Sequence, residues 1–198
     1  DVINCLGRAA EFKDNETGMH VIRMSSYSRI IAESLNLNNE WVDMLYNAAP
    51  MHDVGKIGIP DHILLKPGKL DGDEWEIMKK HVDYGVEILK GHESDILKMA
   101  KVIAESHHEK FDGTGYPYGL VGENIPLPGR IVAIPDVFDA LTSERPYKKS
   151  WSIEKAVALI EEGAGKHFDP RLVKSFKSCL PEILTIKERY SEVQFPHL

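Results

Sequence analysis

Residues 19–35, with the sequence MHVIRMSSYSRIIAESL, decide the fold class. Apolar residues recur in this stretch at three- and four-residue spacing, which predicts a helix that buries one face. These apolar residues are Met19, Ile22, Tyr27, Ile30, Ile31 and Leu35. Similar spacing recurs along most of the chain, and only residues 66–70 or 116–127 are candidates for a short ribbon. The sequence therefore predicts an all-helical domain.

Capping signals mark where several other helices begin. Asp71 with Glu74 has the pattern of a capping box, and Ser152 precedes another helix. Asp169 followed by Pro170 is an N-cap with proline at the first helical position, which predicts the start of the last long helix. Further helices are expected to begin at Trp41 and to run from Asp95 to His107.

The longest irregular segment covers residues 111–129 and contains five glycines and three prolines. Loops of this length inside a compact domain are usually functional or disordered, and we expect an ordered one here. A second irregularity is Pro135, which lies inside a predicted helix directly before Asp136. Because proline removes a backbone donor, it predicts a bend in that helix.

Length and composition predict one globular domain. The chain has 198 residues, of which 42% are hydrophobic and 28% charged, and no repeat or composition shift divides it. It begins with Asp1 rather than Met, and its first apolar residues already have helical spacing. We therefore expect residues 1–15 to continue a helix from a missing upstream region, residues 16–186 to form the domain, and residues 187–198 to be a tail.

The charge and cysteine content restrict the class of protein further. A formal net charge of -7 argues against a protein that coats nucleic acid, so DNA is not an expected partner. An anionic substrate would need a local cluster of positive charge. The apolar runs are too short for a membrane span in this sequence. Cys5 and Cys179 lie far apart outside any metal-binding pattern, which predicts unpaired thiols and a cytoplasmic location.

Two adjacent pairs, His52-Asp53 and His107-His108, carry the strongest chemical signal. Neighbouring helical residues point about 100° apart, so each pair is able to serve two adjoining metal ions. A His-Asp dipeptide alone is a weak signal, for which a surface or capping role is the ordinary interpretation. The signal becomes strong only with the other residues of the pattern, which are Glu16, His20, Lys56, His81 and Asp136.

Four motifs in this order closely resemble the HD-GYP family, the HD-domain phosphohydrolases that degrade cyclic dinucleotides. The resemblance covers about residues 16–176. It implies an all-α, HD-type helical bundle with a Gly/Pro-rich GYP loop. The four motifs are residues 52–61 (HDVGKIGIPD), 66–68 (KPG), 107–117 (HHEKFDGTGYP) and 139–148 (DALTSERPYK).

The resemblance implies a centre of two or three divalent metal ions. One ion would be held by His20, His52, Asp53 and Asp136. The other would be held by Asp53, His81, His107 and His108. Five neutral imidazoles leave the ions with excess positive charge, which lowers the pKa of a bridging water towards neutrality. Glu16 would add a third ion, or it stabilises a helix N-terminus. Donors without thiolates suit several metals, and the resemblance favours iron or manganese.

Several residues are expected to act on the substrate or to orient the site. Lys56 lies one helical turn after Asp53, so it is placed to stabilise charge on a bound phosphate, although a solvated surface lysine is the alternative. The resemblance implies that Arg145 and Lys148 bind phosphate or guanine and that Tyr116 stacks on the nucleotide. A purely structural role for the Tyr116 loop stays open. Two further carboxylates are expected to orient the loop or the ligands without binding metal, namely Asp112 and Asp139.

The resemblance implies a phosphodiesterase in which a metal-bridging hydroxide attacks cyclic di-GMP and yields linear pGpG, with GMP after a second cut. Cyclic GMP-AMP is an alternative substrate. A domain that senses the dinucleotide without turnover and a hydrolase of ordinary nucleotides are further alternatives. Expected partners are the missing N-terminal regulatory domain and diguanylate cyclases through the GYP loop, and a homodimer stays open.

Overall fold

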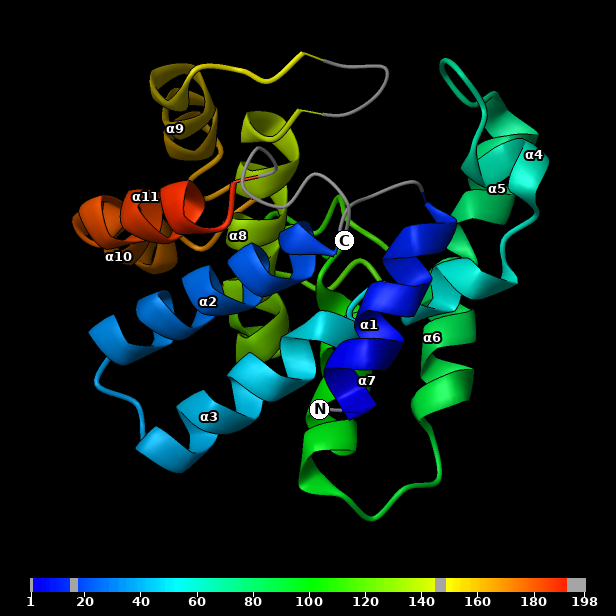
Figure 1. The fold of residues 1–198 in the computed structure, drawn as a ribbon, viewed down its shortest axis with the longest axis horizontal. Helices are drawn as coiled ribbons and strands as arrows, with labels where there is room; N and C mark the ends of the chain where they lie inside the picture. The colour runs from blue at the N-terminus through cyan, green and yellow to red at the C-terminus, as the bar shows by residue number, and fades with distance from the viewer. Residues whose placement is uncertain (1, 15–17, 145–148, 192–198) are drawn as a thin grey trace.

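The computed structural model describes residues 2–14, 18–144 and 149–191 (Figure 1). Its regular elements are all helices, which confirms the predicted fold class. In chain order they are α1 (Val2–Lys13), α2 (Met19–Ser34), α3 (Asn39–Ala48), η1 (Ala49–Met51), η2 (Val54–Gly58), α4 (Asp61–Leu64), α5 (Gly72–Lys79), α6 (His81–Leu89), α7 (Asp95–Ser106), η3 (Gly122–Asn124), α8 (Leu127–Thr142), α9 (Ile153–Glu162), α10 (Pro170–Ser178) and α11 (Leu180–Arg189).

The core lies around α8, which packs against both α2 and α7, and Figure 1 shows α2 crossing in front of α8. Aromatic rings join these helices to the C-terminal part of the chain. The Phe138 ring of α8 lies 5.9 Å from the Tyr27 ring of α2 and 5.1 Å from the Phe176 ring of α10. All three side chains are fully buried, so this contact fixes how α2, α8 and α10 cross.

The predicted helix boundaries hold in most places and fail in two. The 111–129 loop ends earlier than expected, because α8 begins at Leu127 and accepts Pro128 in its first turn, where no backbone donor is needed. Pro135 lies inside α8 as expected, and the helix continues past it to Thr142. The single last helix is wrong, because the chain breaks at Cys179 and restarts with Pro181 in the first turn of α11.

No ribbon forms at residues 66–70 in the described chain, and the 116–127 ribbon is reduced to one isolated bridge between Asp112 and Val121. The loop around it is held by side chains. The buried Glu109 carboxylate accepts hydrogen bonds from the backbone of Tyr118 at 2.7 Å and Leu120 at 3.0 Å. Asp112 accepts from Thr114, so it orients the loop as expected.

A small wing stands beside the main core. It consists of α4 and α5, which Figure 1 shows to one side of the bundle, next to α6. Its own cluster centres on Ile59, Ile63 and Leu64. The predicted capping box is present, since the Asp71 carboxylate accepts from the Glu74 backbone and Glu74 accepts from the Asp71 backbone. None of the helices in the described part of the chain is long and apolar enough to span a membrane.

Gly55 allows η2 and α6 to approach closely. A Cβ atom at this position would overlap the His81 carbonyl oxygen and the Gly85 backbone nitrogen. Gly55→Ala should therefore push α6 away and lower the free energy of unfolding by about 1–3 kcal/mol, as overpacked cores do. Urea denaturation of the purified variant measures this loss.

The matched control is Gly72→Ala at the start of α5, where an added Cβ meets no atom within 4 Å. Its stability should stay unchanged or rise by up to about 1 kcal/mol, because alanine is the better helix former. Equal stability of the two variants would contradict the close approach of η2 and α6.

Candidate metal centre

Five separate segments place histidine and aspartate side chains around one point of the fold. His20 lies in the first turn of α2, His81 begins α6, and Asp136 lies in the middle of α8. The pair His52-Asp53 connects η1 to η2, and the pair His107-His108 follows α7. The fold therefore brings together residues that are up to 116 positions apart in the sequence.

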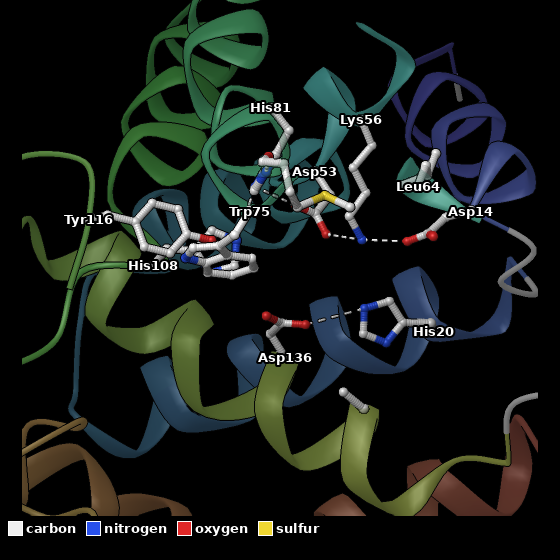
Figure 2. A pocket seen from close by; sticks show the side chains of 12 residues that line it. Asp14, His20, Asp53, Lys56, Leu64, Trp75, His81, His108, Tyr116 and Asp136 are labelled. Atoms are coloured by element: carbon white, nitrogen blue, oxygen red, sulfur yellow. Dashed lines mark hydrogen bonds and ion pairs between the residues drawn. The ribbon is translucent and has the colours of Figure 1, made fainter. Parts of the chain in front are cut away.

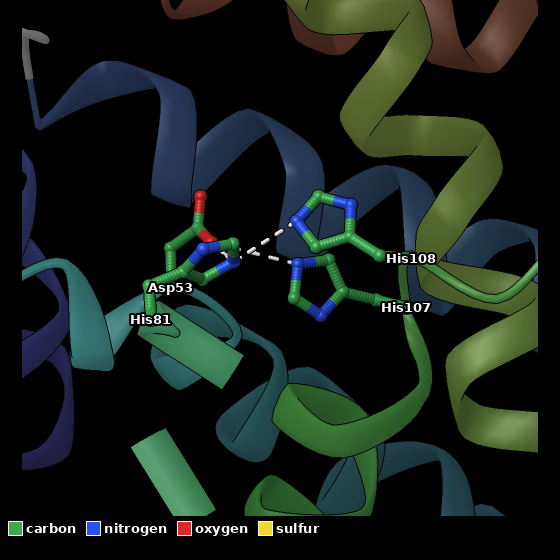
Figure 3. A group of neighbouring side chains, drawn as sticks. All are labelled: Asp53, His81, His107 and His108. Carbon is green, nitrogen blue, oxygen red and sulfur yellow. Dashed lines mark hydrogen bonds and ion pairs between the residues drawn. The ribbon is translucent and has the colours of Figure 1, made fainter. Parts of the chain in front are cut away.

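The first group contains Asp53, His81, His107 and His108, whose nearest ligand atoms lie within 4.8 Å of one another (Figure 3). Asp53 Oδ1 lies 3.3 Å from His81 Nε2 and 3.5 Å from His107 Nε2. His108 Nε2 lies 3.0 Å from His81 Nε2. Four donor atoms therefore converge on one small volume.

The second group contains His20, His52 and Asp136, again with ligand atoms within 4.8 Å. Asp136 Oδ1 lies 3.6 Å from His20 Nε2 and 4.0 Å from His52 Nε2. The other oxygen of Asp53, Oδ2, lies 3.3 Å from His52 Nε2. Asp53 thus presents one oxygen to each group, which is the arrangement expected of a carboxylate that bridges two ions.

The hydrogen bonds of the imidazole rings fit this use. Nδ1 of His52, His81 and His107 lies 3.1, 2.7 and 3.0 Å from a backbone carbonyl oxygen. A carbonyl only accepts, so each Nδ1 carries the proton and each Nε2 directs its lone pair into the centre, as in histidines that bind metal.

Three of the donor atoms at the centre are also buried without hydrogen bonds. Among the described residues, His52 Nε2, Asp53 Oδ1 and His107 Nε2 have no hydrogen-bond partner. Leaving buried polar atoms unsatisfied costs free energy unless another ligand satisfies them. The residues present therefore fit divalent metal ions bound by nitrogen and oxygen donors.

Burial and charge set the protonation of the group. Burial lowers the pKa of His81 and, together with the neighbouring His107, lowers that of His108 well below its usual value. Burial alone would raise the pKa of Asp53, but Lys56 and His52 outweigh it and hold that pKa well below its usual range. His52 differs, because the Asp53 charge raises its pKa despite burial. His81, His108 and Asp53 are therefore already in their metal-binding protonation states.

His20 is oriented by a buried ion pair. Its Nδ1 lies 2.9 Å from Asp139 Oδ2, and Asp139 also accepts from Arg23 Nε at 2.7 Å and Nη2 at 2.8 Å. Arg23 Nη1 donates to the Tyr190 carbonyl at the end of α11. Asp139 orients a candidate ligand, as the sequence suggested, but Arg23 was missed because nothing local marks it.

Two acidic residues near α1 were also missed. Lys56 Nζ lies 2.9 Å from Asp53 Oδ2 and 2.6 Å from Asp14 Oδ2. Glu11 is buried, and its Oε1 lies 3.7 Å from His20 Nε2. The i, i+3 spacing of Glu11 and Asp14 puts both on one side of the chain, which is the only signal that the sequence offered.

A cavity of about 260 Å³ opens over the two groups (Figure 2). Tyr116 stacks on His108 beside it, with ring centroids 4.8 Å apart. Three predicted site residues, Glu16, Arg145 and Lys148, lie outside the described residues. The cavity is lined by Asp14, His20, Asp53, Lys56, Leu64, Trp75, Met78, His81, His108, Tyr116, Asp136 and Ala140.

Known proteins resemble this chain both in sequence and in fold. The sequence model of the HD domain family matches residues 4–172. The cyclic di-GMP phosphodiesterase response regulator RpfG of Xanthomonas campestris is 49% identical over 87% of this chain and 46% of its own length. A 3'3'-cGAMP-specific phosphodiesterase of Vibrio cholerae, number 2, is 46% identical over 94% of this chain and 36% of its own.

Solved structures agree on the fold. The crystal structure of a cyclic GMP-AMP-specific phosphodiesterase of V. cholerae, V-cGAP3, superposes with a TM-score of 0.70 at 21% identity, over 96% of this chain and 52% of that one. The chain belongs to the HD-domain family and, within it, to the HD-GYP proteins. It spans about a third to a half of the length of the two relatives named above.

Asp139→Asn tests the buried ion pair beside His20. Burial alone would raise the pKa of Asp139, but hydrogen bonds from His20 and Arg23 hold it below its usual 3.8. The pair therefore stabilises the fold fully above about pH 4, and the contribution is lost as the pH falls further. The variant leaves Arg23 buried without its anion. The free energy of unfolding at neutral pH should therefore fall by about 3–5 kcal/mol.

Urea denaturation in the presence of a chelator measures this effect without bound metal. The control is Glu33→Gln, which removes the exposed pair with Arg29 and should cost less than about 1 kcal/mol. If the Asp139 variant lost no more stability than the control, and kept the wild-type loss of stability below pH 4, the buried pair would not stabilise the fold as described.

Proposed function

We propose that this chain is the catalytic part of a metal-dependent phosphodiesterase that hydrolyses cyclic di-GMP to linear pGpG, with GMP as the product of a second cut. The observation that carries the proposal is the Asp53 carboxylate between the two histidine-containing groups, with Lys56 beside it at the floor of an open cavity. Relatives that are 46% and 49% identical to this chain and bear phosphodiesterase names support the same reaction.

The first group and the second group would each hold one divalent ion, with Asp53 shared between them. Imidazole and carboxylate donors without thiolates are compatible with iron or manganese, which we propose as the native metals. When bound, two such ions neutralise charge on a phosphodiester and lower the pKa of a coordinated water. We further propose that Glu16 supports a third ion.

Lys56 is the residue of this chain best placed to act on the substrate. Its ammonium lies between the Asp53 and Asp14 carboxylates, which hold it at the cavity floor in a fixed position. A fixed cation there stabilises the negative charge that grows on phosphate oxygens in the transition state. Asp14 is an acceptor beside the same position and can orient a proton-bearing group, while Arg145 and Lys148 are proposed to bind the substrate's phosphates or guanine.

Cyclic GMP-AMP is the second candidate substrate. A relative named as specific for 3'3'-cGAMP is 46% identical to the chain, close to the 49% of the cyclic di-GMP phosphodiesterase RpfG. The groups that hold the phosphate do not distinguish the two molecules, because both present the same phosphodiester. The preference therefore depends on contacts with the bases.

The remaining proposals concern the larger protein. We propose that residues 16–186 form the main part of the phosphohydrolase unit and that residues 1–15, which contribute Glu11 and Asp14 to the site, connect it to an upstream regulatory domain. Residues 187–198 are proposed to include a tail that follows the end of α11 at Arg189. We also propose that the protein is cytoplasmic, that it binds diguanylate cyclases through the GYP loop and that it forms a homodimer. The greater length of the relatives supports a regulatory domain elsewhere in the protein.

Chromatography of products tests the reaction directly. Protein purified without oxygen and supplied with ferrous or manganous ion is incubated separately with cyclic di-GMP and with cyclic GMP-AMP. Linear products are expected from cyclic di-GMP, and the ratio of initial rates gives the preference. If a protein with about two metals per chain leaves both substrates intact, the phosphodiesterase is wrong and a sensor of the dinucleotide takes its place.

Asp53→Ala should remove both turnover and most bound metal, because it deletes the carboxylate that faces both groups. Activity should fall by at least about 1,000-fold, and metal content from about two ions per chain to less than one. Product chromatography and elemental analysis measure the two effects.

Asp112→Ala is the matched control, since Asp112 lies on the neighbouring loop and bonds to Thr114. It should keep its metals and most of its activity. Full metal content in the Asp53 variant would show that Asp53 does not bridge two ions.

A further inference from the structure

Part of the cavity lining is apolar, although charged side chains line it too. Leu64, Trp75, Met78 and Tyr116 line the cavity together with the metal centre, and we call these four residues the apolar wall. A negatively charged phosphodiester gains no binding free energy from contact with such a surface. The apolar wall therefore fits a different part of a ligand whose phosphate lies over Asp53.

Trp75 is the most unusual member of the apolar wall. It lies on α5, a helix without a single buried residue among those described, and its side chain is 44% exposed. Figure 2 shows its ring reaching over the site beside Tyr116 and His108. A large aromatic side chain that is left half exposed at a cavity gains free energy when a flat apolar ligand covers it.

The aromatic rings of Tyr116 and Trp75 differ in how much ring surface remains accessible to a ligand. Tyr116 stacks on His108 at an interplanar angle of 23°, so one of its faces is already covered. Trp75 meets the Tyr116 ring nearly at a right angle, 82°, with centroids 5.9 Å apart. This edge contact fixes the orientation of the indole and leaves indole surface accessible to a ligand.

The wing holds Trp75 rigidly. The capping box fixes the start of α5 one turn before Trp75, and Lys66 Nζ binds the same Glu74 carboxylate at 2.5 Å. Two and three residues after Trp75, Ile77 and Met78 pack against the cluster of the wing. The indole is therefore presented by a helix anchored on both sides, which lowers the entropic cost of ligand binding.

We propose that Trp75 binds a purine base by stacking, and that it does so for one base of the cyclic dinucleotide whose scissile phosphate lies over Asp53 and Lys56. This inference rests on the proposed function. Stacking on tryptophan needs only a π face and tolerates any base. Trp75 therefore supplies affinity for cyclic di-GMP and cyclic GMP-AMP alike, and does not choose between them.

Steady-state kinetics of the metal-loaded protein test this role. Trp75→Ala should raise KM for both cyclic dinucleotides by about tenfold to a hundredfold and leave kcat within about threefold. Trp75→Phe keeps an aromatic face and should stay within about fivefold of the wild-type KM. Trp75→Leu keeps apolar volume without a π face and should behave like the alanine variant, so it separates stacking from packing of α5.

Fluorescence provides a second readout that does not depend on turnover. The chain has three tryptophans, so Trp41→Phe/Trp151→Phe leaves Trp75 as the only indole. Guanosine 5'-monophosphate should quench its emission, whereas ribose 5-phosphate, which has the phosphate without the base, should not. Circular dichroism of each variant checks that it is folded.

The two readouts distinguish failure of this inference from failure of the proposed function. Wild-type KM in both the alanine and leucine variants, or equal fluorescence responses to the two phosphates, would overturn stacking on Trp75. If the wild type hydrolyses neither cyclic dinucleotide, the proposed function fails. The fluorescence comparison then decides base binding by itself, since quenching by the nucleotide alone supports it and an equal response overturns it.

Discussion

The Asp53 carboxylate faces two histidine-containing groups at once, and the rest of the site depends on where it lies. Asp53 belongs to the short segment between η1 and η2, and the histidines around it belong to α2, α6 and the end of α7. The centre therefore exists only if several helices approach this segment within a narrow tolerance. Small residues permit that approach. A Cβ at Gly129 of α8 would overlap Ser106, the residue before His107, so α7 and α8 meet there only because Gly129 has no side chain.

The charge of the protein has to be reconciled with an anionic substrate. The chain carries a net charge of -7, and its site adds the carboxylates of Glu11, Asp14, Asp53 and Asp136 to only one described lysine, Lys56, in the cavity. Such a cavity repels a phosphodiester unless divalent cations compensate it. Neutral imidazoles suit this purpose, because they bind cations without cancelling their charge. The histidine-rich ligand set and the acidic surroundings are thus two parts of one electrostatic balance.

Sequence patterns predicted most of the helices because helical spacing and capping residues are local signals. The adjacent His-Asp and His-His pairs are local signals too, but the full set of candidate ligands was implied only by the resemblance to the HD-GYP family. The residues that sequence reasoning missed act over long distances. Arg23 meets Asp139 across 116 positions, and Lys56 meets Asp14 across 42. Trp75 was not singled out either, since nothing local says that α5 has no buried face. The break at Cys179 was missed because an N-cap predicts where a helix begins and not where it ends.

The crossing of α2 and α8 couples the metal centre to the stability of the fold. On α2, His20 and Arg23 are one turn apart, and on α8 the same spacing separates Asp136 from Asp139. His20 contacts both aspartates, facing the centre through Nε2 and the core through Nδ1. Arg23 continues the chain of contacts to the Tyr190 carbonyl at the end of α11. A displacement of α11 would therefore move Arg23, then Asp139, and then the ring that serves the centre. One buried carboxylate, Asp139, thus joins the candidate metal centre to the packing of the C-terminal helix, although Tyr190 lies far from the centre in the sequence.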